Sequence, residues 1–171
     1  MQDELPEVTI RPAVVDDADA IAQVHVASWR QAYAGHVPQA QLDGLDTGSW
    51  SRSWRDRIAG RHGTILVAED DGDVIGFVSY GASRDEDASP GTIEIYAIYL
   101  EPHAWGHGAA REMMRTLLGS LPDSGTVTLW ALASNERARH FYRRHGFTPD
   151  GVERMEEIGG ASVLEVRYRR G

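Results

Sequence analysis

The stretch that decides the fold is Ile98-Tyr-Leu-Glu-Pro-His-Ala-Trp-Gly106-His-Gly108-Ala-Ala-Arg111. It predicts a strand, a tight turn with two glycines and the start of a helix. Glycines leave the backbone N–H groups of the turn uncovered, and the helix directs the positive end of its dipole at the same place. Arg111 adds a cation in the first helical turn. The stretch therefore predicts a site for a phosphate group.

A glycine pair before a helix also occurs in ordinary strand-to-helix connections, so the turn alone leaves a purely structural interpretation open. Two common phosphate sites fit this chain poorly. A Walker loop ends in Gly-Lys-Ser/Thr, which does not occur here, and a dinucleotide fingerprint needs a third glycine where Arg111 stands. The sequence therefore disfavours a nucleoside triphosphate or NAD as the ligand.

The composition is that of an ordinary globular protein. The 171 residues are 42% hydrophobic and 25% charged, which suits one domain. We expect this domain to span residues 8–169, after a short N-terminal tail of residues 1–7. No apolar run is long enough to span a bilayer and no signal peptide is visible, so we expect a cytoplasmic protein without a membrane partner.

Charge and cysteine content exclude several classes of function. The formal net charge of -9 argues against nonspecific nucleic-acid binding and favours, weakly, a cationic substrate such as an amine. The absence of cysteine excludes disulfides, thiolate metal sites and a cysteine nucleophile. His103 and His107 have the spacing of a helical metal pair, but they flank a turn and lack a third ligand. We interpret them as surface histidines and expect no metal.

Hydrophobic periodicity and turn residues divide the chain into strands and helices. Strands are expected at residues 8–12, 64–69, 74–80, 93–100, 126–132, 152–158 and 163–168. Helices are expected from a cap at Asp16-Asp17 to about Tyr33, and over residues 51–58, 106–118 and 135–144. Between the first two helices, Gly35, Pro38 and Gly44 break the helical pattern. This order predicts one mixed α/β sheet with helices on its faces.

A second motif follows the predicted strand at residues 126–132. Asn135 and Tyr142 are seven residues apart, about two helical turns, so they lie on one face of the helix. The Asn135 side chain can either cap this helix or reach a ligand. Phe141 and Tyr142 are typical of core aromatic residues, but a buried tyrosine hydroxyl still needs a partner. We expect that hydroxyl to emerge near the edge of the sheet that carries the glycine turn.

Together the two motifs resemble the signatures of the GNAT superfamily of acyl-CoA-dependent N-acetyltransferases. The turn Trp105-Gly-His-Gly108-Ala-Ala110 resembles that family's pyrophosphate loop, Arg/Gln-x-x-Gly-x-Gly/Ala, with Trp105 in place of Arg or Gln. The run Asn135…Ala138…Phe141-Tyr142…Gly146-Phe147 resembles its second signature, Asn-x-x-Ala-x-x-hydrophobic-Tyr-x-x-x-Gly-Phe. The order of predicted elements is also similar from about residue 8 to residue 169.

The resemblance implies a fold and a co-substrate, acetyl-CoA. The fold is a mostly antiparallel twisted sheet of about seven strands, flanked by four helices and splayed between the fourth and fifth strands. The pantetheine arm of acetyl-CoA would lie along the fourth strand like an extra strand, and the pyrophosphate would lie over the glycine turn. A homodimer is a further expectation from the family. The cofactor-binding residues implied are Ile98, Tyr99, Leu100, Gly106, His107, Gly108, Ala109, Ala110, Arg111 and Asn135.

Acetyl transfer to an amine requires a proton acceptor, because an alkylammonium with a pKa near ~10.4 cannot attack a thioester. Glu94 is the candidate, since it lies six residues before Leu100 and, by the alternation of a strand, on the same face. Tyr96 shares this face and could order a water molecule instead. A solvated or ion-paired glutamate is the structural alternative for Glu94.

The departing thiolate needs stabilisation, and Tyr142 resembles the general acid of the family. A phenol (~10) is less acidic than a thiol (~8.5), so full proton transfer in water is uphill by ~2 kcal/mol. We therefore interpret Tyr142 first as a hydrogen-bond donor to the developing thiolate. Because the chain has no cysteine, direct attack in a ternary complex is the expected mechanism.

The acceptor amine is not identified by the sequence. By the resemblance, Trp29, Tyr33 and His36 border the acceptor site, but Trp29 and Tyr33 are one helical turn apart, which is typical of core packing. A catalytically silent module that binds acyl-CoA on the same fold is the alternative function. Release of CoA in the presence of amines distinguishes the two.

Overall fold

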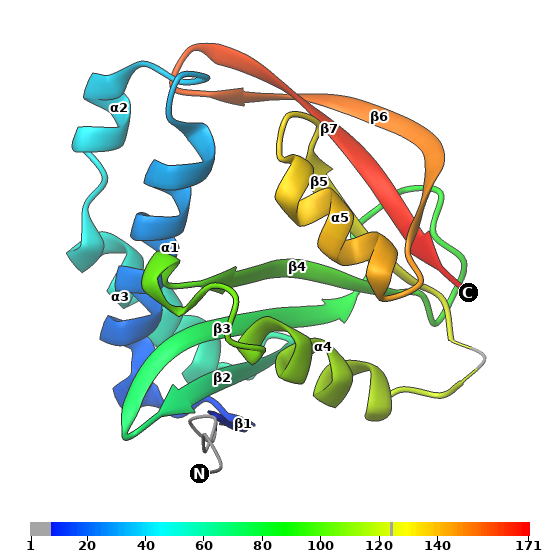
Figure 1. The fold of residues 1–171 in the computed structure, drawn as a ribbon, viewed down its shortest axis with the longest axis horizontal. Coiled ribbons are helices and arrows are strands. Elements are labelled where there is room, and N and C mark those ends of the chain that lie inside the picture. The colour runs from blue at the N-terminus through cyan, green and yellow to red at the C-terminus, as the bar shows by residue number, and fades with distance from the viewer. Residues whose placement is uncertain (1–7, 124) are drawn as a thin grey trace, which may run out of the picture.

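The structure is a computed structural model, in which residues 8–123 and 125–171 are described; the predicted tail, residues 1–7, lies outside this part. A seven-stranded sheet runs in the order β1-β2-β3-β4-β5-β7-β6 (Figure 1). Its strands are β1 (Val8–Pro12), β2 (Thr64–Asp70), β3 (Asp73–Ala82), β4 (Ile93–Leu100), β5 (Val127–Leu132), β6 (Thr148–Ile158) and β7 (Ala161–Arg170). The α-helices are α1 (Ala18–Tyr33), α2 (Gln39–Asp43), α3 (Thr47–Ala59), α4 (Ala109–Gly119) and α5 (Glu136–Arg144), with short 3-10 turns at Val15–Asp17 and Pro102–Ala104.

The sheet opens between β4 and β5. All neighbouring strands pair antiparallel except these two, which are parallel and pair only over residues 93–95 and 127–129. Figure 1 shows β5 turning away from β4 beyond this short ladder. The predicted mixed sheet and its splay between the fourth and fifth strands are thus confirmed.

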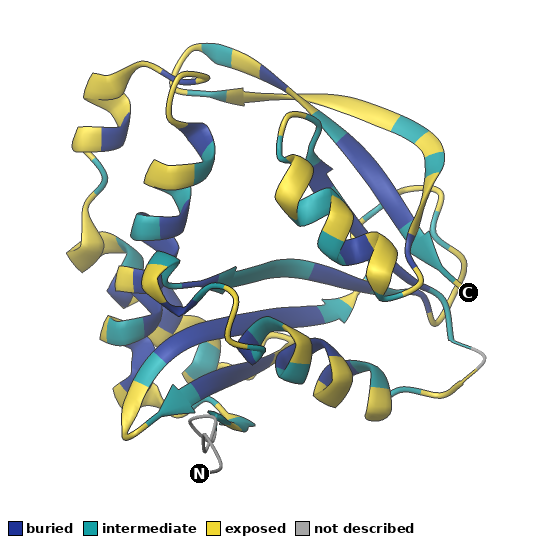
Figure 2. Cartoon of the chain, viewed as in Figure 1, coloured by how far each residue is buried: buried dark blue, intermediate teal, exposed yellow. Residues whose placement is uncertain are grey.

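Helices cover both faces of the sheet, because consecutive apolar residues of the central strands point to opposite sides. In β2, Ile65 and Val67 pack with α1 and α3, whereas Leu66 and Ala68 belong to the core that includes α4. Figure 2 shows the central strands buried and β6, at the edge, largely exposed. No helix in the described part of the chain is long and apolar enough to cross a membrane.

A short helix and a helix cap are among the local features that differ from the prediction. The segment that was expected to break helices contains a short fifth helix, α2, which Pro38 precedes and Gly44 ends. The predicted cap of α1 is wrong in detail, because the Asp17 side chain does not cap that helix. It accepts two hydrogen bonds from the Arg11 guanidinium (2.8 and 2.9 Å), which holds the pKa of Asp17 below its ordinary value.

A β-bulge in β4 reverses the predicted facing of one residue. Against β3, Ala97 pairs with Ser79 but Ile95 pairs with Tyr80, so Tyr96 is an extra residue. Ile95 and Leu100 consequently lie in the same core, on the side of α4. Glu94, next to Ile95, therefore points to the opposite face from Leu100, and the expectation that Glu94 and Leu100 share a face is wrong.

His25 on α1 makes stability depend on pH. It is buried among aromatic rings, with Trp50 and Tyr99 at centroid distances of 4.2 and 5.4 Å, and its Nδ1 accepts a hydrogen bond from Trp54 Nε1 (3.1 Å). Burial, with a smaller contribution from Arg57, lowers the pKa of His25 from 6.5 to about 4. The native protein thus keeps His25 neutral where the unfolded chain binds a proton.

The unfolding free energy should therefore fall as pH drops from 6.5 to 4, by on the order of 3 kcal/mol. Gln at this position can still accept the Trp54 hydrogen bond but cannot titrate. We expect His25→Gln to flatten this part of the pH profile in denaturant titrations, and His62→Gln, at an exposed histidine, to leave it unchanged. An equal slope in wild-type protein and His25→Gln would contradict the assignment.

Candidate functional site

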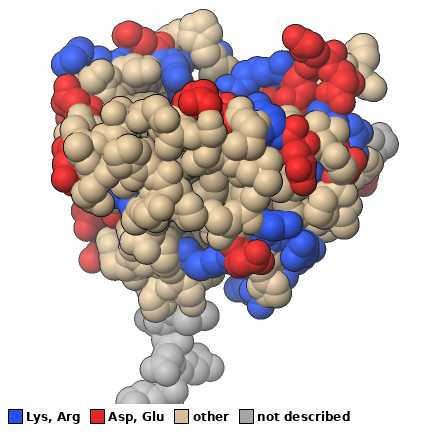
Figure 3. All heavy atoms as spheres, turned by 90° about the horizontal axis from the view of Figure 1, so that it is seen from above, with Lys and Arg blue, Asp and Glu red and all other residues tan. Residues whose placement is uncertain are grey.

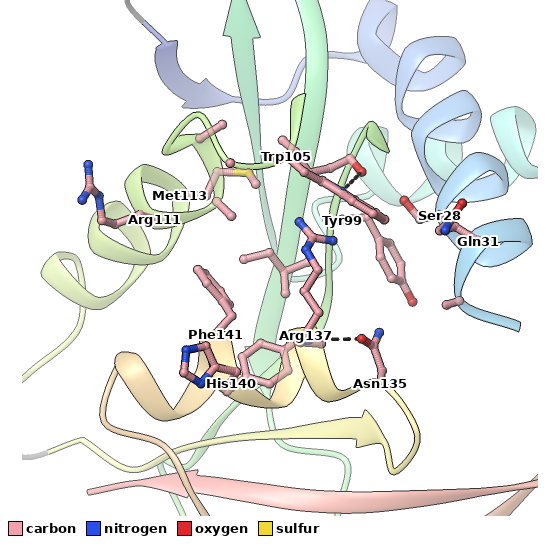
Figure 4. A pocket seen from close by; sticks show the side chains of 18 of the residues that line it. Ser28, Gln31, Tyr99, Trp105, Arg111, Met113, Asn135, Arg137, His140 and Phe141 are labelled. Atoms are coloured by element: carbon pink, nitrogen blue, oxygen red, sulfur yellow. Dashed lines mark hydrogen bonds between the residues drawn. The ribbon is translucent and has the colours of Figure 1, made fainter. Parts of the chain in front are cut away.

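A cavity of about 890 Å³ lies where β4 and β5 separate, bounded by α1, β4, the glycine turn, α4 and α5 (Figure 4). Every residue predicted to bind the cofactor lines it, together with Tyr142. Glu94, Tyr96, Trp29 and Tyr33 do not. Of the two predicted catalytic residues, Tyr142 therefore lines the cavity and Glu94 does not.

The glycine turn presents unpaired backbone donors to this cavity. Gly106 and Gly108 have φ angles of +81° and +86°, which favour glycine, and Gly108 is the N-cap residue of α4. No side chain caps α4, and the amides of Ala109, Ala110 and Arg111 have no acceptor in the described part of the chain. Arg111 stands in the same turn. These donors, with the helix dipole, favour an anion.

The outer edge of β4 also faces the cavity. Its ladder with β5 ends at Ile95, so residues 98–100 have no strand partner on that side in the described part of the sheet. The Leu100 carbonyl accepts a hydrogen bond from Trp105 Nε1 (3.2 Å). A free strand edge can pair with an extended ligand that carries amides, as a further strand would.

Tyr142 brings a phenol to the cavity from α5. The residue is 8% exposed and packs against Phe141, Phe147 and Tyr168. Burial raises the pKa of Tyr142, and Tyr99 adds to this effect. A raised pKa keeps the phenol protonated, so its hydroxyl is available as a hydrogen-bond donor.

The Asn135 side chain caps α5, which is the first of the two roles that the sequence left open. Its Oδ1 accepts a hydrogen bond from the backbone N–H of Ala138 (3.1 Å) and so begins α5. The residue also lines the cavity. Its side-chain carbonyl is thus engaged in the cap, which leaves the amide nitrogen for a ligand.

Glu94 is an ion-paired residue of the sheet. It is 2% exposed, and Arg84 donates to both of its oxygens, from the backbone N–H (2.9 Å) and the guanidinium (2.7 Å). The Arg84 guanidinium also lies 4.4 Å from the centre of the Tyr96 ring, and the Tyr96 hydroxyl donates to the Ala82 carbonyl. This geometry is that of an ion-paired glutamate, which the sequence analysis gave as the structural alternative for Glu94.

The residues predicted to border the acceptor site have different environments. Trp29 and Tyr33 pack on each other, with ring centroids 5.0 Å apart, and Tyr33 belongs to a core cluster with Val37. His36 lines the cavity, and its Nε2 lies 3.3 Å from Ser134 Oγ. His36 therefore links the end of α1 to the loop between β5 and α5, across the splay.

Several cavity residues escaped the sequence prediction. Ser28 and Gln31 on α1, and Arg137 and His140 on α5, all line the cavity. Ser28 is buried and its Oγ has no hydrogen-bond partner in the described part of the chain. A signal for it existed: Ser28 follows Ile21 and Val24 at helical spacing, so it is a polar residue in a core-facing row.

The charges around the cavity are of one sign. Arg111, Arg137 and Arg144 line it, and no described lining residue is Asp or Glu. On the face drawn in Figure 3, acidic and basic side chains both surround a broad uncharged area. In the described part of the chain, no three His, Asp or Glu side chains are placed to hold a metal ion. The cavity thus offers cations and amides to an anionic ligand.

The fold and this cavity together define a coenzyme A-dependent acyltransferase. The chain belongs to the Acetyltransferase (GNAT) family, which residues 24–147 match. It is therefore an acyltransferase whose co-substrate is acetyl-CoA.

Similar proteins agree. The uncharacterized N-acetyltransferase YuaI of Bacillus subtilis is 32% identical over 93% of this chain and 90% of its own length. A mycothiol acetyltransferase of Cellulomonas flavigena is 35% identical over 88% of this chain, but over only 43% of its own length. The crystal structure of the PaiA N-acetyltransferase of Thermoplasma acidophilum with coenzyme A has a TM-score of 0.73 and 18% identity, and the match covers 96% of this chain and 98% of that one.

Proposed function

We propose that this protein transfers the acetyl group of acetyl-CoA to a primary amine by direct attack in a ternary complex, with residues 8–169 as one catalytic unit. The observation that carries the proposal is the convergence of three elements on one cavity. These are the uncapped amides of the glycine turn, the free edge of β4 and the Tyr142 phenol.

In this proposal the co-substrate lies along β4. The amides of its pantetheine arm pair with the backbone of residues 98–100, and its pyrophosphate lies over the amides of residues 106–111. The Asn135 side-chain nitrogen contacts the arm. The open edge of β4 and the positive φ angles of Gly106 and Gly108 support this placement.

The reaction then requires one bond exchange and one proton transfer. The amine nitrogen attacks the thioester carbonyl carbon, a C–N bond forms, the C–S bond breaks and CoA leaves as a thiolate. Tyr142 donates a hydrogen bond to the sulfur as negative charge develops there. The proton of the attacking amine passes to a base, directly or through a water molecule.

Glu94 as the proton acceptor stays a prediction, which its ion pair with Arg84 makes testable. If Glu94 takes the proton, Glu94→Gln should lower kcat by ~10²-fold or more, since a lost general base typically costs this much. Arg84→Gln is the matched control, because it breaks the same ion pair and keeps the carboxylate. Equal losses in both variants would mean that the pair only supports the sheet.

His36 is a candidate base among the histidines that line the cavity. His36→Gln should leave kcat almost unchanged if Glu94 is the base. If His36→Gln loses most of its kcat while Glu94→Gln stays active, His36 and not Glu94 is the base. Comparing kcat for the two variants with the same amine separates the candidates.

The acceptor is proposed only as a class, a primary amine, and the net charge of -9 favours a cationic one. The relatives differ in acceptor by their names, so their substrates do not transfer to this chain. A cytoplasmic location and a homodimer stay predictions.

Calorimetric titration with acetyl-CoA, followed by a panel of amines monitored for free thiol, tests the proposal. Binding with thiol release in the presence of one amine class supports it and names the acceptor. Binding without release from any amine favours the silent acyl-CoA-binding module. If acetyl-CoA does not bind, the cavity has been assigned to the wrong ligand.

A further inference from the structure

Arg137 on α5 and Trp105, beside the glycine turn, meet across the cavity. The guanidinium carbon of Arg137 lies 3.5 Å from the centre of the Trp105 ring, and both residues line the cavity. The next shortest such distance in the described part of the chain is 4.1 Å, between Arg154 and Trp130. Figure 4 shows Arg137 reaching from α5 toward Trp105 on the opposite wall. The contact therefore joins the two walls that the splay separates.

The Trp105 ring is a fixed platform for this contact. Its Nε1 donates a hydrogen bond to the Leu100 carbonyl at the end of β4 (3.2 Å), so the indole is held by the strand edge. A planar guanidinium that lies on an aromatic face keeps its N–H groups in its own plane. The stack thus orders Arg137 and leaves its N–H edge available.

No acidic side chain neutralises Arg137 in the described part of the chain. Its neighbour Arg139, two residues along α5, donates to the Tyr168 hydroxyl and the Ala133 carbonyl and lies 3.7 Å from Glu136. Arg137 has no such bond or ion pair among the described residues, and no described cavity residue is acidic. A guanidinium without a counter-ion, at the mouth of a cavity with uncapped helix amides, suits phosphate, which it binds through two parallel hydrogen bonds.

We propose that Arg137, held by Trp105, binds a phosphate group of acetyl-CoA and so makes the cavity select the full coenzyme over acyl thioesters without phosphate. This inference rests on the proposed function, because it assumes that acetyl-CoA occupies the cavity. Arg137 closes over the ligand from α5, opposite the amides of the glycine turn. It is a binding residue, and Trp105 is its positioning residue.

The test compares two ligands that differ in phosphate. Affinity for acetyl-CoA is measured by calorimetry, and affinity for S-acetyl-pantetheine, which has no phosphate, by competition. We expect Arg137→Gln to weaken acetyl-CoA binding by about tenfold or more, the scale of a lost charge-assisted hydrogen bond, and S-acetyl-pantetheine binding by less than about twofold. Arg137→Lys, which keeps the charge but not the planar fork, should be intermediate for acetyl-CoA.

Two further variants keep the test decisive. Arg115→Gln removes a positive charge from α4 outside the cavity, where Arg115 faces Glu112 at 3.6 Å, and should change neither affinity. Trp105→Leu should weaken acetyl-CoA binding in the same selective way, because Arg137 loses its platform. Equal weakening of both ligands by Arg137→Gln, or no change in either, would overturn the inference. Wild-type protein that does not bind acetyl-CoA would instead overturn the proposed function beneath it.

Discussion

Tyr142→Phe should lower kcat by ~10²- to 10³-fold, the usual loss when one donor to a developing anion is removed. The substitution deletes only the hydroxyl, so the ring keeps its packing against Phe147 and Tyr168 and acetyl-CoA should bind almost as before. Because burial raises the pKa of Tyr142, the wild-type donor should stay protonated up to at least pH 10. We therefore expect that kcat does not decrease below this pH through deprotonation of Tyr142.

The matched control is Tyr80→Phe. Tyr80 is another buried tyrosine of the same core, but its hydroxyl faces Ser120 (3.4 Å) and does not line the cavity. Both variants lose one phenolic hydroxyl, and only Tyr142→Phe should lose turnover. Steady-state kinetics and acetyl-CoA titration of the two proteins check this. Unchanged turnover in Tyr142→Phe would mean that Tyr142 only packs in the core and does not take part in the reaction.

Gly108→Val should weaken acetyl-CoA binding by about tenfold or more, because a β-branched residue strains a φ angle of +86° by an estimated 1–2 kcal/mol. Gly108 is the N-cap residue of α4, so relief of this strain would shift the amides that face the cavity. A side chain here would also stand beside Arg111, since an added Cβ lies 3.5 Å from its guanidinium nitrogen.

The control for Gly108→Val is Gly72→Val in the turn between β2 and β3. Gly72 has a φ angle of +84°, and an added Cβ there meets nothing within 4 Å. Thermal unfolding should show similar destabilisation of the two variants, whereas calorimetry should show weaker acetyl-CoA binding only in Gly108→Val. If Gly108→Val binds acetyl-CoA with unaltered affinity, the assignment of the phosphate to the glycine turn is wrong.

Much of the fold follows from local patterns. β4 has the predicted bounds, and the glycine turn leads into a helix as expected. The two motifs, of which the first ends at Ala110 and the second begins at Asn135, do line one cavity. The short helix α2 was not predicted, because its boundary residues, Pro38 and Gly44, are typical of both loops and helix ends.

All residues predicted to bind the cofactor line the cavity, whereas only one of the two predicted catalytic residues does. Except for Asn135, the cofactor-binding prediction used residues within one short stretch, 98–111, whose geometry depends on their own backbone angles and on the start of α4. The predicted facing of Glu94 assumed an unbroken alternation along β4, and the single extra residue Tyr96 reverses that facing. Whether a strand carries a bulge depends on its pairing with β3, which the residues of β4 do not reveal.

The sequence by itself determined most of the elements, the glycine turn and the family, because each depends on residues within one or two turns of the chain. Only the tertiary structure decided which face Glu94 occupies, that Arg84 binds both of its oxygens, and that His36 meets Ser134. It also decided that Arg137 meets Trp105. These contacts join segments that are distant in sequence or separated by a turn. Their geometry depends on strand register and on the splay of β4 from β5, which the packing of the whole sheet sets.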